Sequence, residues 1–189
     1  LYMSIPFRQV LSLKPMQGER WKRLNELAEE YQPRGIYVGN MGTQALLGNI
    51  IISRWADESC SEREIEAMFL HEIGHLKDRL TAKLTLSLIL VIGGITVLLN
   101  TIFIFPTWWE QLIPPVIGLA VYLPILQRYY PRYEYRADKH ATDKGYGDEL
   151  ISLLQKEGEE TGVLAGSIRG FVYPSAEERI KKIRENRGG

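Results

Sequence analysis

Two histidines and a glutamate stand at a spacing that suits metal chemistry. His71 and His75 are four residues apart in His71-Glu72-Ile73-Gly74-His75, which on a helix is a rotation of about 400°. Both imidazoles therefore leave one helix face and can bind the same ion. Glu72 lies about 100° round from His71, too far to be a ligand but near the ion's open position. There it can take a proton from water and pass it to a leaving amine.

This pattern, His-Glu-x-x-His on a helix, is typical of zinc peptidases. Neutral imidazole is a good zinc ligand. The chain has only three histidines and two of them fall in the pattern, so the alternative, a helix with two incidental histidines, is disfavoured. The spacing predicts one Zn²⁺ per chain, bound by His71 and His75.

A catalytic zinc needs a third protein ligand, and Glu134 and His140 are the downstream candidates. Glu134 and Asp138 share a helix face, whereas His140 lies about 240° round from Glu134 and points elsewhere. We therefore favour Glu134 as the ligand and expect His140 to be a surface histidine. Asp138 can accept the free N–H of a ligating histidine and fix its tautomer. Taken without the histidines, the two acids would indicate only a solvated helix face.

Two apolar segments separate the histidines from Glu134. Residues 84–105 carry no charge and would form a helix of about 33 Å, which matches a bilayer core. The second segment, 112–126, is shorter and contains three prolines. Aromatic pairs at Trp108-Trp109 and Tyr129-Tyr130 stand where interfacial aromatics belong. The alternative is a buried apolar hairpin within a soluble protein.

Both sides of this apolar region must reach one metal, so the number of membrane crossings must be even. We expect a transmembrane helical hairpin, 84–127, inserted in a single domain made of 1–83 and 128–189. The loop 106–111 has no basic residue. By the positive-inside rule, basic residues beside the hairpin place the site in the cytoplasm. These residues are Lys77, Arg79, Lys83, Arg128, Arg132 and Arg136.

The other elements predict an α+β fold that is mainly helical, with a small antiparallel sheet. Helical spacing covers 19–31, 132–144 and a segment after Ser175. Ser61-x-x-Glu64 is a capping box that would begin the histidine helix, which we expect to end near residue 80. Short strands are expected at 36–38 and, bent at Gly48-Asn49, within 45–55.

Charge and cysteine content narrow the function classes. Lys plus Arg and Asp plus Glu number 23 each, so the net charge is zero and a nucleic-acid partner is not expected. The single cysteine, Cys60, allows neither an internal disulfide nor a thiolate metal site. The expected partners are a protein or peptide substrate and the lipid bilayer.

The sequence resembles the membrane zinc metalloproteases of the HtpX and CaaX prenyl endopeptidase family, from about residue 36 to 183. The resemblance rests on three motifs: His71-Glu72-Ile73-Gly74-His75, Glu134-Tyr135-Arg136-Ala137-Asp138 and Tyr173-Pro174-Ser175-Ala176-Glu177-Glu178-Arg179-Ile180. It implies a zincin-type fold with His71, His75 and Glu134 as zinc ligands. It also implies Glu72 as the base and Asp138 as the partner of a ligand.

The resemblance implies two further functions within the site. In the family the last motif begins with His-Pro, and its histidine and a following arginine stabilise the oxyanion; Arg179 matches that arginine. Tyr173 replaces the histidine, and a phenol can also donate to an oxyanion, although the alternative is a tyrosine packed on the last helix. A substrate-binding edge strand is implied by a degenerate match, Gln44-Ala45-Leu46-Leu47-Gly48.

Family members usually carry transmembrane segments before the catalytic helix, and the prenyl endopeptidases have many helices around a chamber. Neither is expected here, which favours the HtpX-like branch. The sequence thus predicts a membrane-anchored zinc endopeptidase that cleaves membrane or membrane-proximal proteins in quality control or processing. The alternatives are a non-catalytic zinc-fold scaffold or regulatory subunit, against which the intact Glu72 counts, and a soluble metallopeptidase.

Overall fold

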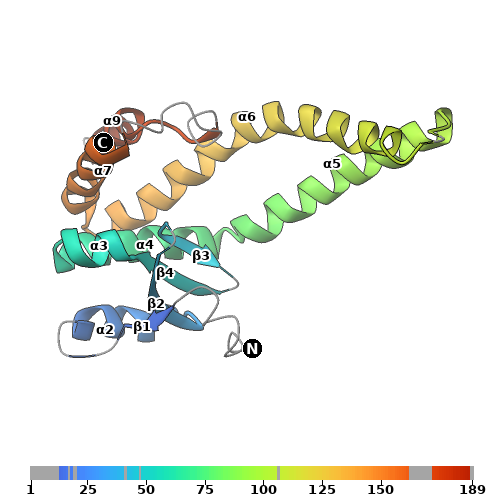
Figure 1. Ribbon diagram of the computed structural model, residues 1–189. Helices are drawn as coiled ribbons and strands as arrows, with labels where there is room; N and C mark the ends of the chain where they lie inside the picture. The colour runs from blue at the N-terminus through green and yellow to red at the C-terminus, as the bar shows by residue number, and fades with distance from the viewer. Residues whose placement is uncertain are drawn as a thin grey trace.

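The protein is mainly helical, with one small sheet (Figure 1). The computed structural model describes residues 13–16, 18, 21–40, 42–46, 48–105, 107–161 and 172–187. Helix α4 (Glu62–Lys77) is central, since the sheet and α2 (Lys22–Tyr31) lie on one side of it. On its other side it contacts α7 (Gly147–Thr161), which packs in turn against α9 (Ala176–Arg187). The histidine pattern is therefore held between two layers.

The sheet is mixed, so the expectation of an antiparallel sheet is wrong. Its strand order is β1 (Lys14–Pro15), β2 (Gly35–Gly39), β4 (Asn49–Ser53) and β3 (Gln44–Leu46). Only β2 and β4 run parallel; the outer pairs are antiparallel. The chain reverses before β3 and again at Gly48, whose φ of 83° suits glycine, so β4 regains the direction of β2.

The strand expected to continue to Trp55 ends at Ser53, where α3 (Arg54–Ser59) begins. The Ser53 side chain caps this helix by accepting the Ala56 N–H at 3.2 Å. The predicted capping box of α4 is confirmed. Ser61 N–H donates to the Glu64 carboxylate at 2.7 Å, and Glu64 N–H donates to the Ser61 hydroxyl at 3.3 Å.

The two apolar segments form a long helical hairpin that projects from the rest of the protein (Figure 1). It consists of α5 (Leu80–Ile102), a short 3₁₀ turn η2 (Glu110–Leu112) and α6 (Ile113–Asp143). The sequence predicted a separate helix at 132–144, but α6 continues through Pro124 and Pro131 into it. The two helices pack closely, since a Cβ on Gly118 would lie 2.9 Å from the Ile92 Cα.

The hairpin exposes most of the large apolar side chains found on the described surface. Leu90, Val97, Ile104 and Val116 are each more than 60 % exposed. Two segments are long and apolar enough to cross a membrane: Ala82–Ile102, with a mean hydropathy of 2.2, and a second that includes α6, with 1.3. Apolar side chains in such number on one projection indicate contact with lipid.

A buried glutamate joins the first turn of α4 to α7, a helix for which the sequence patterns made no prediction. Besides capping α4, the Glu64 carboxylate accepts hydrogen bonds from Ser152 and Lys156, each at 2.7 Å. Burial raises the pKa of Glu64, but the hydrogen bonds from Lys156, Ser152 and Ser61 outweigh it and lower the pKa to about 2. The ionised carboxylate therefore stabilises the folded chain.

We predict that Glu64→Gln lowers the free energy of unfolding by about 2 kcal/mol at neutral pH. Because the folded pKa of about 2 lies below the ordinary 4.5, this stabilisation is complete above pH 4.5 and is lost as the pH falls toward 2. Thermal melts in detergent should show the melting temperatures of the wild type and Glu64→Gln converging as the pH is lowered. Glu62→Gln, at an exposed acid of the same turn, is the control. An equal gap at all pH values would contradict the prediction.

Candidate active site

Helix α4 places the imidazoles of His71 and His75 together in a buried position, and α6 brings Glu134 to them. The His71 Nε2 and His75 Nε2 atoms are 3.1 Å apart. The Glu134 carboxylate lies 3.5 Å from the first of these nitrogens and 3.3 Å from the second. Among the described residues these three form the one group of ligand-type side chains able to hold a metal ion.

The spacing of these ligand atoms fits zinc. A tetrahedral zinc with ligands at about 2.0–2.1 Å places neighbouring ligand atoms about 3.3 Å apart. The two imidazole nitrogens are 3.1 Å apart, and His71 and His75 lie 3.5 and 3.3 Å from the Oε2 and Oε1 atoms of Glu134, distances near this value. Two nitrogens and a carboxylate are also the donor set of a zinc site that keeps one position open. His71, His75 and Glu134 therefore fit a zinc ion.

The contact between α4 and α6 is direct, backbone against backbone. A Cβ on Gly74 would lie 2.7 Å from the Ala137 Cα and 3.1 Å from its Cβ. Gly74 sits between the two histidines in the sequence, and Ala137 lies between Glu134 and Asp138. The absence of a side chain at Gly74 therefore sets the distance at which Glu134 meets the two imidazoles.

A buried ion pair between Arg179 and Asp138 supports the ligand set. His71 Nδ1 lies 2.9 Å from the Asp138 carboxylate, so it donates there and leaves the Nε2 lone pair facing the other ligands. Arg179, from α9, binds both Asp138 oxygens, with Nε at 2.9 Å and Nη2 at 2.5 Å. Its Nη1 lies 3.5 Å from Glu134. The sequence associated Arg179 with an oxyanion, and the pairing with Asp138 was not foreseen.

Burial and charge set the protonation of the two neighbouring groups on α4. Burial lowers the pKa of His71, but hydrogen bonds to Asp138 and Glu134 outweigh it and raise the pKa to about 10. Surroundings that favour a proton there also favour a metal cation. Burial raises the pKa of Glu72 above 4.5, although His71 and His75 oppose this shift. A raised pKa suits a carboxylate that must accept and then release a proton.

Tyr173 lies beside a second phenol, Tyr130, which the sequence suggested only as an interfacial aromatic. The Tyr130 hydroxyl donates to the Tyr173 oxygen at 2.6 Å, and the ring centroids are 4.4 Å apart. Tyr130 is 8 % exposed and Tyr173 is 37 % exposed. Tyr130 precedes Glu134 by four residues and so shares its helix face, which is the spacing signal that could have revealed it.

The predicted substrate strand lies against α4. Gln44, Ala45 and Leu46 form β3, an edge strand of the sheet that contacts α4, and the Ala45 backbone opposes the rise that burial causes in the pKa of Glu72. Gly48 lies in the turn to β4, and Leu47 lies outside the described residues. The edge strand β3 therefore lies beside the expected base.

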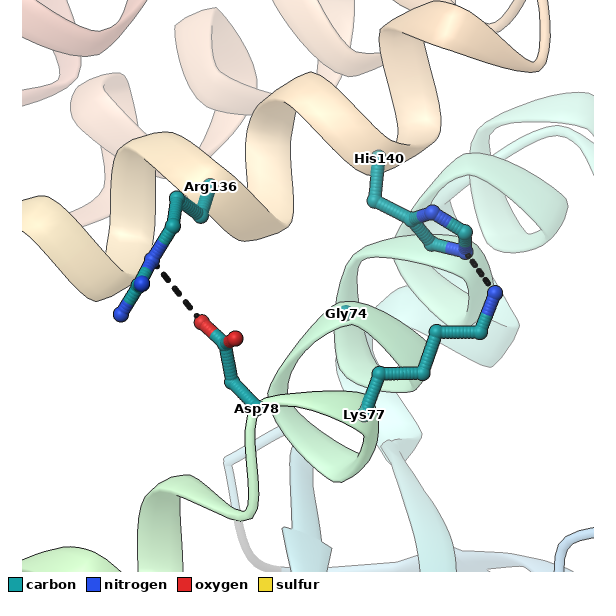
Figure 2. A pocket seen from close by; sticks show the side chains of 5 residues that line it. All are labelled: Gly74, Lys77, Asp78, Arg136 and His140. Atoms are coloured by element: carbon teal, nitrogen blue, oxygen red, sulfur yellow. Dashed lines mark hydrogen bonds and ion pairs between the residues drawn. The ribbon is translucent and has the colours of Figure 1, made fainter.

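His140 lies outside the metal-ligand group, in a separate cavity of about 170 Å³. Figure 2 shows it facing Lys77, with a 3.5 Å contact, while Arg136 pairs with Asp78 at 3.0 Å across Gly74. This placement agrees with the helical geometry that set His140 aside in favour of Glu134.

The fold is similar to that of Ste24p from S. mikatae, known from a crystal structure. The TM-score is 0.72 at 17 % sequence identity, and the match covers 95 % of this chain and 52 % of that one. The chain thus spans about half the length of the structure that it matches. Comparisons with family models and with curated proteins gave no match. The architecture is therefore of the Ste24p type.

We predict that Gly74→Ala lowers both stability and zinc content, because the new methyl group would separate α4 from α6 and move Glu134 from the histidines. Overpacking of this kind costs about 1–3 kcal/mol. Zinc per chain by elemental analysis and the thermal midpoint are the measurements. Gly93→Ala is the control, since a Cβ there meets nothing within 4 Å. Full zinc occupancy in Gly74→Ala would contradict this account of the contact.

Proposed function

We propose that the protein is a membrane-anchored zinc endopeptidase that hydrolyses peptide bonds of membrane or membrane-proximal proteins. The observation that carries the proposal is the buried group of His71, His75 and Glu134 at zinc-ligand spacing, with Glu72 beside it. The likeness to Ste24p, a zinc metalloprotease of the CaaX prenyl endopeptidase type, supports it. The assignment to the HtpX-like branch stays a prediction.

Each residue of the site has a task that follows from its position. His71, His75 and Glu134 would hold one zinc ion, which when bound supplies a Lewis acid and lowers the pKa of its water to about 7. Glu72 accepts a proton as water attacks the scissile carbonyl and delivers it to the departing amine. Asp138 keeps His71 in the tautomer whose Nε2 is free, and Arg179 keeps Asp138 ionised and in place.

The substrate would bind as an extended strand. An added strand can pair with β3 through its main chain, and this mode accepts many sequences because side chains contribute little. Because the Ala45 backbone lies close to Glu72, a strand added to β3 would run near the base. Tyr173, exposed beside the site, would donate to the oxyanion of the tetrahedral intermediate.

The hairpin of α5 and α6 would anchor this site to a bilayer. In this proposal residues 84–127 are a transmembrane insertion, and residues 1–83 and 128–189 form one catalytic domain in the cytoplasm. Basic side chains gather where α4 ends and α6 leaves the apolar segment, and three of them, Lys83, Arg132 and Arg136, lie over tyrosine rings. Such residues suit the interface of a membrane on its cytoplasmic side.

We predict that Glu72→Gln keeps zinc but loses peptidase activity by at least about 100-fold, because the amide cannot accept the proton. Glu134→Ala should lose zinc as well as activity. Casein cleavage by the purified protein in detergent, blocked by phenanthroline and restored by zinc, is the assay. A Glu72→Gln protein that cleaves at the wild-type rate would overturn the mechanism. A zinc-loaded wild type without activity would favour a scaffold.

For the membrane orientation we predict that a cysteine in place of Trp108 is labelled by an impermeant thiol reagent on sealed cells. A cysteine in place of Lys181, on α9, should be labelled only after lysis. Both positions are exposed, and the native Cys60 is buried, so background labelling should be low. Labelling of position 181 in sealed cells would reverse the orientation. Release by carbonate without detergent would instead support a soluble protein.

A further inference from the structure

The direct contact between α4 and α6 has two flanks, and only one of them carries the metal-ligand group. Measured round α4 from Gly74, the two ligand histidines lie about 60–100° to one side and Lys77 lies about 60° to the other. Measured round α6 from Ala137, Glu134 lies about 60° to one side and His140 about 60° to the other. Lys77 therefore meets His140 on the flank that is turned away from the ligands.

A cavity of about 170 Å³ lies on this second flank, lined by Gly74, Lys77, Asp78, Arg136 and His140. Lys77 and His140 stand at one end of it, and Arg136 and Asp78 stand at the other (Figure 2). A water molecule takes about 30 Å³ in the liquid, so the cavity has room for a group of about five heavy atoms. Lys77 and Arg136 are exposed, so such a group could reach them from the solvent.

The cation at one end of the cavity has only uncharged or cationic neighbours among its close contacts. The Lys77 ammonium lies 3.5 Å from the His140 Nε2 and 4.6 Å from the centroid of the Tyr31 ring. Neither ring can supply a negative charge. In the part of the chain that the structure describes, the nearest lining acid, Asp78, pairs with Arg136 and not with Lys77. The charge of Lys77 is therefore available to an anion.

Arg136 adds further donors at the other end. Its Nε lies 3.0 Å from the Asp78 carboxylate, and its guanidinium carbon lies 4.7 Å from the centroid of the Tyr133 ring. A guanidinium has five N–H donors, so the bond from Nε leaves those of the two terminal nitrogens for a ligand. Two cations and one acid line the cavity, so its net charge is positive.

We propose that this cavity binds a phosphate group, which Lys77 and Arg136 hold between α4 and α6. Lys77 supplies a point charge, and the planar fork of Arg136 matches two phosphate oxygens. The group can belong to free phosphate or to an anionic lipid. A headgroup is within reach, because Asp78 stands only a few residues before the apolar span that begins at Ala82. Basic pockets beside membrane spans suit such headgroups.

The test uses the full chain, purified in a neutral detergent without phosphate. Potassium phosphate is titrated at neutral pH while the thermal midpoint is recorded, with potassium chloride at matched ionic strength as the reference. A ligand that binds the folded chain raises the midpoint, so we expect a saturating rise with phosphate and none with chloride. Lys77→Ala should weaken the apparent phosphate affinity by at least about tenfold, and Lys77→Arg should largely restore it.

Lys139→Ala is the matched control, because Lys139 is an exposed lysine of α6 that pairs with Asp143 at 2.7 Å and does not line the cavity. It should bind phosphate as the wild type does. Equal losses in Lys139→Ala and Lys77→Ala, or an equal rise with chloride, would mean diffuse surface attraction and would overturn the inference.

Nanodiscs of phosphatidylcholine, with and without phosphatidic acid, distinguish the two sources of the phosphate group. A higher midpoint with phosphatidic acid, lost in Lys77→Ala, would assign the site to a lipid headgroup. A rise with potassium phosphate and no difference between the discs would assign it to free phosphate. No rise with either probe would overturn the inference. Binding is read without zinc or turnover, so an inactive protein that binds phosphate would overturn only the function proposed above.

Discussion

The site depends on the direct contact between α4 and α6 at Gly74 and Ala137. The two imidazoles come from one helix and the carboxylate from another, about sixty residues later in the chain, with the whole apolar hairpin between them. Neither helix carries a complete ligand set. Because the backbones touch, the ligand separations follow from the packing of the helices, and little depends on flexible side chains. The geometry of the ligand group is therefore set by the packing of α4 against α6.

The parts of the site that could be predicted from the sequence are those governed by helical spacing. His71, Glu72 and His75 are within one turn, so their relation follows from the geometry of any helix. Glu134 followed from the need for a third ligand, and Asp138 from its position one turn later. The structure brings the three ligand-type residues together and leaves His140 in a separate cavity. The capping box of α4 is equally local, and it is confirmed.

The features that were missed depend on contacts between distant segments. Whether β4 runs parallel or antiparallel to β2 is decided by how the chain reverses around β3, which the apolar run at 50–52 does not encode. The sequence separated the second apolar segment from a helix at 132–144, yet α6 runs through Pro124 and Pro131 without a break. The bonds from Arg179 to Asp138, and from Tyr130 to Tyr173, join residues about forty apart. Periodicity carries no signal for such pairs.

The ion pair between Arg179 and Asp138 has a consequence for biosynthesis. The chain emerges from the ribosome starting at its N-terminus, so α4 and the hairpin are complete well before α9. Until then the histidines lack the guanidinium that holds Asp138 in place. The hairpin is thus synthesised before the site can be completed. In the function proposed above, the ligand group would therefore reach its final geometry only after α9 has been made.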